Sequence, residues 1–279
     1  MNITVIISIY KDIESLNLIL ESLSTQTNQN FNIIISEDSN FKEVSDYILN
    51  YETNLKIKHI SQEDKGWRKN KALNNAIKAS DGEYLIFLDG DIIPYKKFIE
   101  NHIESAEKNY FLSGRRVELG PYFSKLIRLK KLSYRTIEKY YPFFIPFFLI
   151  DTARHIEEGI YFKKNSFLEN KINKNKKKNM MLVGCNFSCY KKDLEKINGF
   201  DEDYISPSVG EDVDLSWRFN YFGIYSKSVR YVANTFHLHH SRNWGNALDE
   251  NNQIMKDKQI KKEYICRNGL TDQGNKDES

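Results

Sequence analysis

The first 90 residues alternate short apolar runs with segments of helical periodicity, and this alternation restricts the fold more than any other feature of the chain. The apolar runs are rich in strand-forming side chains, whereas the segments between them place leucine and isoleucine at helical spacing. We expect strands at 3–9, 31–35, 55–60 and 83–88, separated by helices at 12–25, 42–51 and 69–80. Such alternation predicts an α/β fold with a mostly parallel sheet and crossover helices.

The second half of the chain lacks this regular alternation. We expect helices at 98–108 and 212–221, the second terminated by Gly223, and a helix with a polar tail within 251–279. Strands are expected at 109–117, 181–190 and 231–240. The expected units are therefore 1–118, 119–181, 182–250 and 251–279.

Residues 121–180 form a basic and aromatic segment, with 14 Lys/Arg against 5 Asp/Glu in a chain whose net charge is +3. The aromatic run at 140–150 is too short to span a bilayer, and two prolines are expected to break it. The basic side chains that precede this run are Lys125, Arg128, Lys130, Lys131 and Arg135. The segment predicts a surface that faces something anionic.

Two interpretations of this segment stay open. Basic side chains beside tyrosine and phenylalanine suit an interface with anionic lipid head groups, which would give peripheral contact with a membrane. A helical hairpin that solvates its charges is the alternative, and it would pack inward Phe143, Phe144, Phe147 and Phe148.

Length and composition exclude several classes of protein. A chain of 279 residues that is 40% hydrophobic can build one large domain or two small ones, so wholesale disorder is excluded. The N-terminus has no basic region before its short apolar run, so we expect a strand there and a cytoplasmic protein. Cys185, Cys189 and Cys266 are expected to be buried free thiols. The small net charge and the lack of a recognition motif argue against nucleic acid as a partner.

Two carboxylates, Asp89 and Asp91, follow the apolar run 84–88 and are separated only by Gly90. Ligands of open α/β sheets bind outside the carboxyl ends of the strands. Carboxylates at such a position can hold a divalent cation through hard oxygen ligands. Because Asp-Gly is also a strong turn signal, a simple turn remains the alternative.

Two further acidic clusters lie at ends of expected elements. Glu37 and Asp38 follow the second strand, where they could cap a turn or accept hydrogen bonds from a ribose or base. Glu211, Asp212 and Asp214 open a helix, where the dipole favours acids. A carboxylate at this second position could instead act as a general base.

Three histidines occur within the four residues 237–240. In a strand His237 and His239 would share a face, whereas a turn at His239 would let His237 and His240 converge. Imidazole is a common metal ligand, so metal binding is preferred over a structural role. Together with Asp91, such a cluster would suit a metal that neutralises departing phosphates, while a carboxylate deprotonates an attacking hydroxyl.

Several motifs together carry a family likeness. They are the segments 5–10, 33–38, 66–74 and 82–94 of the first half and 184–188, 198–201, 210–212 and 237–240 of the second. On these motifs the chain resembles a family 2 glycosyltransferase of the GT-A fold. Its second half is similar to the galactosyltransferase-type module of β-1,4-galactosyltransferases and bacterial chondroitin polymerase domains. The resemblance implies a Rossmann-like fold with a mixed central sheet and a helical basic and aromatic insertion.

The resemblance also implies roles for particular residues. The residues expected to bind the nucleotide-sugar are Ser8, Tyr10, Asp38, Trp67, Lys69 and Asp89. Asp91, His237 and His240 would hold Mn²⁺ or Mg²⁺, Asp212 would be the catalytic base, and Glu211 would contact the acceptor. Relatives usually carry a Trp-Gly-Gly before the Glu-Asp pair, where this chain has residues 206–210, so the sugars are not defined by the motif.

The expected activity is inverting transfer of a hexose or N-acetylhexosamine from a UDP-sugar to a glycan or lipid-linked glycan, in bacterial surface polysaccharide or lipopolysaccharide synthesis. The enzyme would work in the cytoplasm or at the inner face of the cytoplasmic membrane. The alternative is a non-catalytic module that binds a sugar nucleotide or glycan. A nucleotidyltransferase would need a glycine-rich phosphate loop, which does not appear near the first strand.

Overall fold

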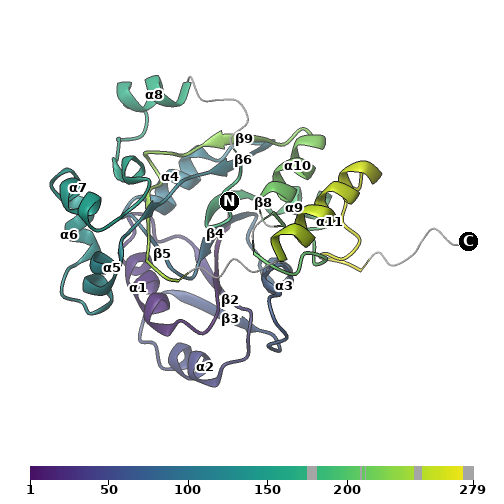
Figure 1. Ribbon diagram of the computed structural model, residues 1–279, viewed down its shortest axis with the longest axis horizontal. Coiled ribbons are helices and arrows are strands. Elements are labelled where there is room, and N and C mark those ends of the chain that lie inside the picture. The colour runs from purple at the N-terminus through teal and green to yellow at the C-terminus, as the bar shows by residue number, and fades with distance from the viewer. Residues whose placement is uncertain (175–180, 208, 211, 242–246, 273–279) are drawn as a thin grey trace, which may run out of the picture.

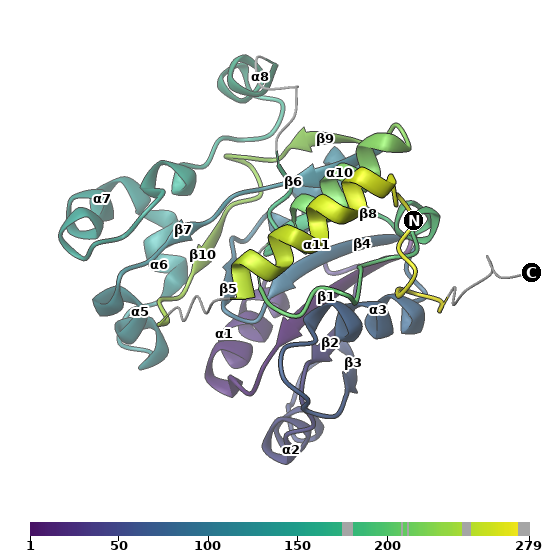
Figure 2. The same ribbon diagram turned by 45° about the vertical axis from the view of Figure 1, so that its right-hand side comes forward.

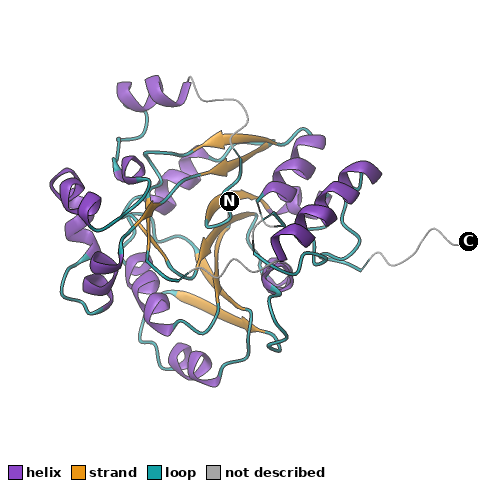
Figure 3. Ribbon diagram, viewed as in Figure 1, coloured by secondary structure: helices purple, strands orange, loops and turns teal. Residues whose placement is uncertain are grey.

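The computed structural model describes residues 1–174, 181–207, 209–210, 212–241 and 247–272. Within these residues the main sheet has seven strands in the order β3-β2-β1-β4-β8-β6-β9 (Figures 1 and 3). The strands are β1 (Ile3–Ile9), β2 (Asn32–Glu37), β3 (Lys56–Ser61), β4 (Tyr84–Asp89), β6 (Tyr110–Ser113), β8 (Asn186–Tyr190) and β9 (Tyr225–Ser228). The four strands of the first half are parallel, as expected, and β8 runs antiparallel between β4 and β6. The α/β fold with a mixed central sheet is therefore confirmed.

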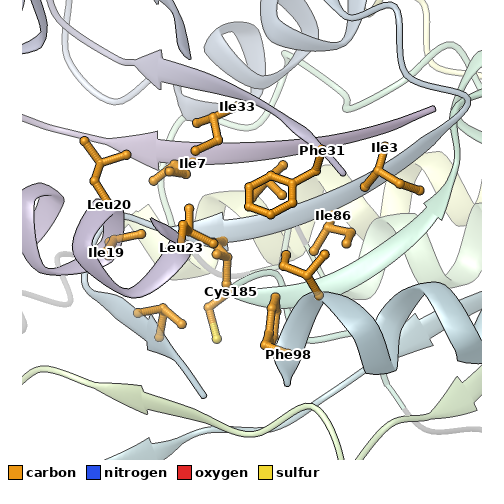
Figure 4. Close-up of a cluster of buried hydrophobic side chains, with 14 of the residues drawn as sticks. Ile3, Ile7, Ile19, Leu20, Leu23, Phe31, Ile33, Ile86, Phe98 and Cys185 are labelled. Carbon is orange, nitrogen blue, oxygen red and sulfur yellow. The ribbon is translucent and has the colours of Figure 1, made fainter. Parts of the chain in front are cut away.

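Helices cover both faces of this sheet. On one face α1 (Ile13–Ser24), α2 (Lys42–Leu49) and α4 (Phe98–Ser105) pack on β1, β2 and β4, and Figure 4 shows part of that cluster. On the other face lie α3 (Lys69–Ala79), α9 (Lys191–Lys196) and α10 (Val213–Tyr221). The C-terminal helix α11 (Ala247–Lys261) lies beside α10 (Figure 2). Because both faces are covered, β1 is buried along its whole length, β4 is buried up to Asp89, and both strands are mostly apolar rather than alternating.

A second, three-stranded sheet was not expected. It consists of β5 (Ile92–Pro94), β10 (Thr235–His237) and β7 (Val117–Glu118), in the order β5-β10-β7. The single strand predicted at 109–117 is wrong, because β6 joins the large sheet and β7 joins the small one. The strand predicted at 231–240 shortens to three residues. Strands of two to four residues are too short for side-chain periodicity to reveal them.

Residues 119–174 form the expected helical insertion. Its helices are α5 (Pro121–Arg128), α6 (Tyr134–Lys139), α7 (Tyr141–Ile150), the short η1 (Ile156–Gly159) and α8 (Phe167–Lys174). Ion pairs fasten it to the helix α1 region: Arg128 contacts Asp12 at 3.3 Å and Lys130 contacts Glu21 at 2.5 Å. These two basic side chains therefore contribute to packing of the insertion.

The prolines of the aromatic run do not break it, contrary to expectation. Pro142 lies in the first turn of α7, where a missing N–H costs nothing, and the helix continues through Pro146. Because Pro146 has no N–H, the carbonyl of Pro142 lacks the hydrogen bond that a helix would give it. Pro142 is exposed to solvent. In the described parts of the chain, no helix combines the length and apolar character needed to cross a bilayer.

The three cysteines are buried and form no disulfide within the described residues, as expected. Cys185 and Cys189 pack in the clusters on opposite faces of the sheet.

Candidate active site

The site begins where β4 ends. Gly90 lies so close to β1 that an added Cβ would be 2.8 Å from the carbonyl oxygen of Ser8. Glycine is therefore required there, because no side chain fits between the two strands. The chain turns at this point with Asp89 beside Ser8 in the strand register, and Asp91 follows at the start of the small sheet.

The small sheet brings the histidine segment to Asp91. His237 pairs with Ile92 in the antiparallel register of β10 and β5, and the Leu238 N–H donates to the Asp91 carbonyl at 3.0 Å. As a result, Nε2 of His237 and Nε2 of His240 each lie 3.2 Å from Oδ2 of Asp91. Ligand atoms of all three residues lie within 4.8 Å of one another.

The sequence left open which two histidines converge, and the turn after β10 decides it. His239 is exposed, and its backbone N–H donates to Oγ of Ser124 in α5 at 2.8 Å. His237 and His240 therefore face Asp91, whereas the side chain of His239 points away from this cluster.

The chemistry of this cluster fits a divalent cation. Burial alone would raise the pKa of Asp91, but hydrogen bonds and charge from His237 and His240 hold that pKa well below its ordinary value. Oδ1 of Asp91 is buried and has no hydrogen-bond partner among the described residues. Nδ1 of His240 donates to the Ser241 carbonyl at 3.0 Å, which orients the ring so that Nε2 faces Oδ2 of Asp91. An imidazole nitrogen and a carboxylate oxygen at this separation share either a proton or a metal ion.

A cleft of about 720 Å³ opens beside the cluster. Every residue predicted to bind the nucleotide-sugar lines it: Ser8, Tyr10, Asp38, Trp67, Lys69 and Asp89. The three predicted metal ligands line it too. The cleft lies at the carboxyl ends of β1, β2 and β4, which explains why segments distant in sequence meet there.

Asp38 is buried at the end of β2 and is held by the loop between β3 and α3. Its Oδ1 accepts from Nε2 of Gln62 at 2.6 Å, and its Oδ2 accepts from the backbone N–H of Arg68 at 2.7 Å. Burial raises the pKa of this carboxyl despite those two donors. The Arg68 contact places Asp38 next to Trp67, which is partly exposed in the cleft.

Two other contacts shape the wall of the cleft that Lys69 and Tyr10 line. Lys69, the first residue of α3, donates from Nζ to Oδ1 of Asp89 at 2.7 Å, and this ion pair is mostly shielded from solvent. Tyr10 donates from its hydroxyl to Asp64 at 3.2 Å, and Lys11 donates to the same carboxylate oxygen at 2.7 Å. The loop after β1 and the loop after β3 are thus joined across the rim.

Asp212 immediately precedes α10, and its Oδ1 accepts from the backbone N–H of Gly184 at 2.8 Å. Cys185 follows Gly184 in the chain: burial raises the pKa of its thiol to about 12, and the charges of Asp89 and Asp212 both add to that rise. Asp212 is a described residue that does not itself line the cleft. Glu211 lies outside the described residues.

The sequence analysis did not identify several residues of the lining: Asp12, Arg116, Arg128, Pro207 and Ser241. Arg116 donates to Sγ of Cys185 at 3.0 Å and to Glu118 at 3.3 Å. No signal was available for Arg116, because it lies within the strand expected at 109–117. For Arg128 there was none, because its place depends on how α5 packs against α1.

Two family models match the chain. The model described as glycosyl transferase family 2 matches residues 4–197, and the model described as the N-terminal domain of galactosyltransferase matches residues 168–241. The first match covers well over half of the chain.

Curated relatives include enzymes of known activity. The chondroitin synthase of Escherichia coli is 23% identical over 239 residues, which are 81% of this chain and 33% of that protein. The validoxylamine A glucosyltransferase of Streptomyces hygroscopicus subsp. jinggangensis is 22% identical over 229 residues, 80% of this chain and 52% of that enzyme. The chain spans about half the length of these relatives or less.

Solved structures share the fold. A mannosyltransferase from Pyrobaculum calidifontis, in complex with GDP-Man and Mn²⁺, aligns with a TM-score of 0.57 at 13% identity, over 87% of this chain and 58% of that chain. TarS 1-349 of S. aureus in complex with UDP-GlcNAc aligns with a TM-score of 0.56 at 15% identity, over 87% and 60%. The sheet order, the strand-end cleft and these matches agree, and the chain belongs to glycosyl transferase family 2 and has the GT-A fold.

Proposed function

We propose that this protein is an inverting glycosyltransferase that moves a hexose or N-acetylhexosamine from a UDP-sugar to a glycan acceptor. The observation that carries the proposal is the meeting of Asp91, His237 and His240 at the mouth of a strand-end cleft. A nucleoside diphosphate needs a cation at its phosphates and a pocket with polar and aromatic side chains for its nucleoside. This cleft offers candidate cation ligands and such side chains.

In this proposal the half formed by residues 1–118 binds the donor. Asp38 accepts hydrogen bonds from the uracil or ribose, Trp67 contacts the nucleoside, and Ser8 and Tyr10 complete that wall. Lys69 and Asp89 stand between the nucleoside and the phosphates. Their mutual ion pair of 2.7 Å supports this, because it keeps both charged groups at one position on the cleft wall.

Asp91, His237 and His240 would hold Mn²⁺ or Mg²⁺. When bound, the cation supplies Lewis-acid stabilisation of the negative charge that develops on the UDP leaving group. The unpaired buried oxygen of Asp91 and the orientation of the His240 ring support this ligand set.

The half formed by residues 182–250 would handle the acceptor, with Asp212 as general base and Glu211 as an acceptor contact. The acceptor hydroxyl attacks the anomeric carbon, its proton passes to the Asp212 carboxylate, and the bond from that carbon to the β-phosphate oxygen breaks. Attack from the face opposite the leaving group inverts the anomeric centre. The Gly184 N–H donates to Oδ1 of Asp212 and so helps to hold this carboxylate at the start of α10.

The family relatives support an acceptor in a bacterial surface polysaccharide or lipopolysaccharide. Chondroitin synthases of Escherichia coli and Pasteurella multocida align over about four-fifths of this chain. We propose that the acceptor is a glycan, or a lipid-linked glycan at the inner face of the cytoplasmic membrane, and that the enzyme contacts this membrane peripherally.

A donor screen tests the proposal. The purified chain is incubated with Mn²⁺ and UDP-, GDP- and TDP-sugars, and release of the nucleoside diphosphate is measured. We expect release of UDP from a UDP-hexose or UDP-N-acetylhexosamine, which excess chelator stops. A chain that binds UDP-sugars in calorimetry but releases no UDP, with or without glycan acceptors, would be the non-catalytic binding module instead.

A further inference from the structure

Helix α7 carries an uncovered apolar stripe. Tyr140, just before the helix, and Phe143, Phe147 and Ile150 follow one another at helical spacing, and the last three have exposed fractions of 76%, 58% and 82%. The opposite side of the helix packs inward through Tyr141 and Phe148, and Phe144 and Ile145 are partly buried there. These side chains contact a hydrophobic cluster that also contains Tyr95, Phe123 and Phe236. Of the four phenylalanines that the helical-hairpin interpretation packs inward, Phe144 and Phe148 do so, whereas Phe143 and Phe147 are exposed.

A helix that is hydrophobic on all sides normally has all sides covered. In α7 no charged side chain occurs along the ten residues of the helix, yet one side is open to solvent. Leu149 on α7 and Tyr122 on α5, which packs against α7 through Phe123, are also exposed. Several large apolar side chains exposed on one helix and its neighbour mark a contact with a partner or a membrane.

Charge identifies the partner. Residues 121–155 hold seven Lys/Arg against two Asp/Glu. Arg128, Lys130 and Arg135 are paired with acids of the body or of α6. The remaining basic side chains of the same insertion are exposed, and they are Lys125, Lys131, Lys139 and Arg154. A second copy of this chain would bring the same positive charge to the interface, whereas an anionic bilayer is complementary to it.

We propose that the stripe of Tyr140, Phe143, Phe147 and Ile150 lies at the boundary between head groups and acyl chains of an anionic lipid bilayer. A ten-residue helix is about 15 Å long, so it lies in the interface and does not cross the hydrocarbon layer. Apolar side chains enter the boundary while the surrounding lysines contact anionic head groups.

The same insertion reaches the candidate active site. Ser124 of α5 accepts the backbone hydrogen bond from His239, and Arg128 at the end of α5 lines the cleft. Docking of α7 would therefore hold the cleft near the membrane surface, where a lipid-linked acceptor would be presented. This last consequence rests on the proposed function, whereas the docking itself does not.

Vesicle flotation tests the docking. The full chain is mixed with vesicles of phosphatidylcholine and phosphatidylglycerol, or of phosphatidylcholine alone, at low and high salt. We expect binding to the anionic vesicles that weakens with salt. The double variant Phe143→Ser/Phe147→Ser should bind at least about tenfold more weakly, because two apolar side chains no longer enter the boundary. The matched control is Leu49→Ser, which removes an apolar side chain that is 83% exposed on the distant helix α2.

Charge reversal gives an independent arm. Lys131→Glu/Lys139→Glu should lower the partition coefficient by roughly fivefold or more per lysine, whereas Lys78→Glu/Lys192→Glu, on the other side of the molecule, should have little effect. If the double serine variant fails to fold, Phe147→Cys with an environment-sensitive label replaces it, since the native cysteines are buried. The label should shift to an apolar signal with anionic vesicles, and a label at Leu49→Cys should not.

Three outcomes overturn the inference: no flotation of the native chain at low salt, equal binding by the native and serine chains, or a dimer in light scattering that Phe143→Ser/Phe147→Ser dissolves. The last would assign the stripe to a second copy of the chain. Release of UDP without acceptor is measured in parallel. A chain that floats but releases no UDP refutes the proposed transfer activity alone, and one that releases UDP but does not float refutes the membrane contact and leaves the transfer activity standing.

Discussion

Nε2 of His237 lies 3.2 Å from Oδ2 of Asp91, although the two residues are separated by more than half of the chain. The contact arises because β10 pairs with β5 directly after Asp91 and places His237 opposite Ile92. His240 returns to the same carboxylate oxygen after the turn. Backbone pairing and the following turn therefore bring both imidazoles to Asp91.

The first prediction concerns this cluster. Asp91→Ala should lower transfer activity by roughly 100-fold or more, because a cation at the leaving group contributes several kcal/mol. Excess chelator should have a similar effect on the native chain. Mn²⁺ should raise the melting temperature of the native chain but not of the variant.

The control for Asp91→Ala is Asp46→Ala, which removes an exposed carboxylate from α2 and should retain both activity and the Mn²⁺ shift. Full activity of the native chain in chelator would show that the metal assignment is wrong.

The second prediction is that Asp212→Asn removes turnover and leaves UDP binding nearly intact. An amide cannot take the acceptor proton, and loss of a general base costs about 10²- to 10⁴-fold. The amide oxygen can still accept from Gly184, so the loop should keep its structure. Calorimetry with UDP separates the two effects, and loss of UDP binding would assign Asp212 to the donor site or to folding.

The third prediction is that Trp67→Ala raises the donor KM by about tenfold while kcat changes little. A nucleoside contact is nearly equal in the ground and transition states, so its loss falls on KM. Trp67 is only partly buried, so the melting temperature should change little. Trp217→Ala, which removes the packing on Tyr264 behind the cleft, should leave the donor KM unchanged. A large stability loss without a KM effect would make Trp67 a packing residue.

The fourth prediction concerns pH. His102 is fully buried, with Nδ1 at 2.8 Å from Oγ of Ser188 and Nε2 at 3.1 Å from Oδ1 of Asn186. Burial lowers its pKa from 6.5 to about 3, and the Asn186 bond offsets this only in part. The unfolded chain therefore binds the proton more readily below pH 6.5, so stability is lost as the pH falls.

Through His102, the free energy of unfolding should fall by about 2 kcal/mol between pH 7 and pH 5. Each pH unit below the pKa of the unfolded chain costs about 1.4 kcal/mol. Denaturant titrations at both pH values measure it, and His102→Gln should show a smaller difference. An NMR titration in which His102 becomes charged near pH 6.5 would contradict the prediction.

Local patterns were sufficient for the first half of the chain. Side-chain periodicity depends only on neighbouring residues, so the strand and helix alternation of residues 3–89 could be predicted, and the structure confirms it. The same holds for Asp38, Asp89 and Asp91, because residues that follow parallel strands share one edge of the sheet. All three line the cleft.

Tertiary structure decided what depends on pairing between distant segments. Strands of three residues, such as β5 and β10, carry no periodicity of their own; their register places His237 beside Asp91, and the turn after β10 selects His240 over His239. In α7 every position is apolar, so no local pattern could tell Phe148, which is buried, from Phe147, which faces solvent. The sequence by itself determined the chemistry available at each strand end and the apolar character of the insertion. Only packing between segments far apart in the chain decided which of those groups meet and which side of the helix stays open.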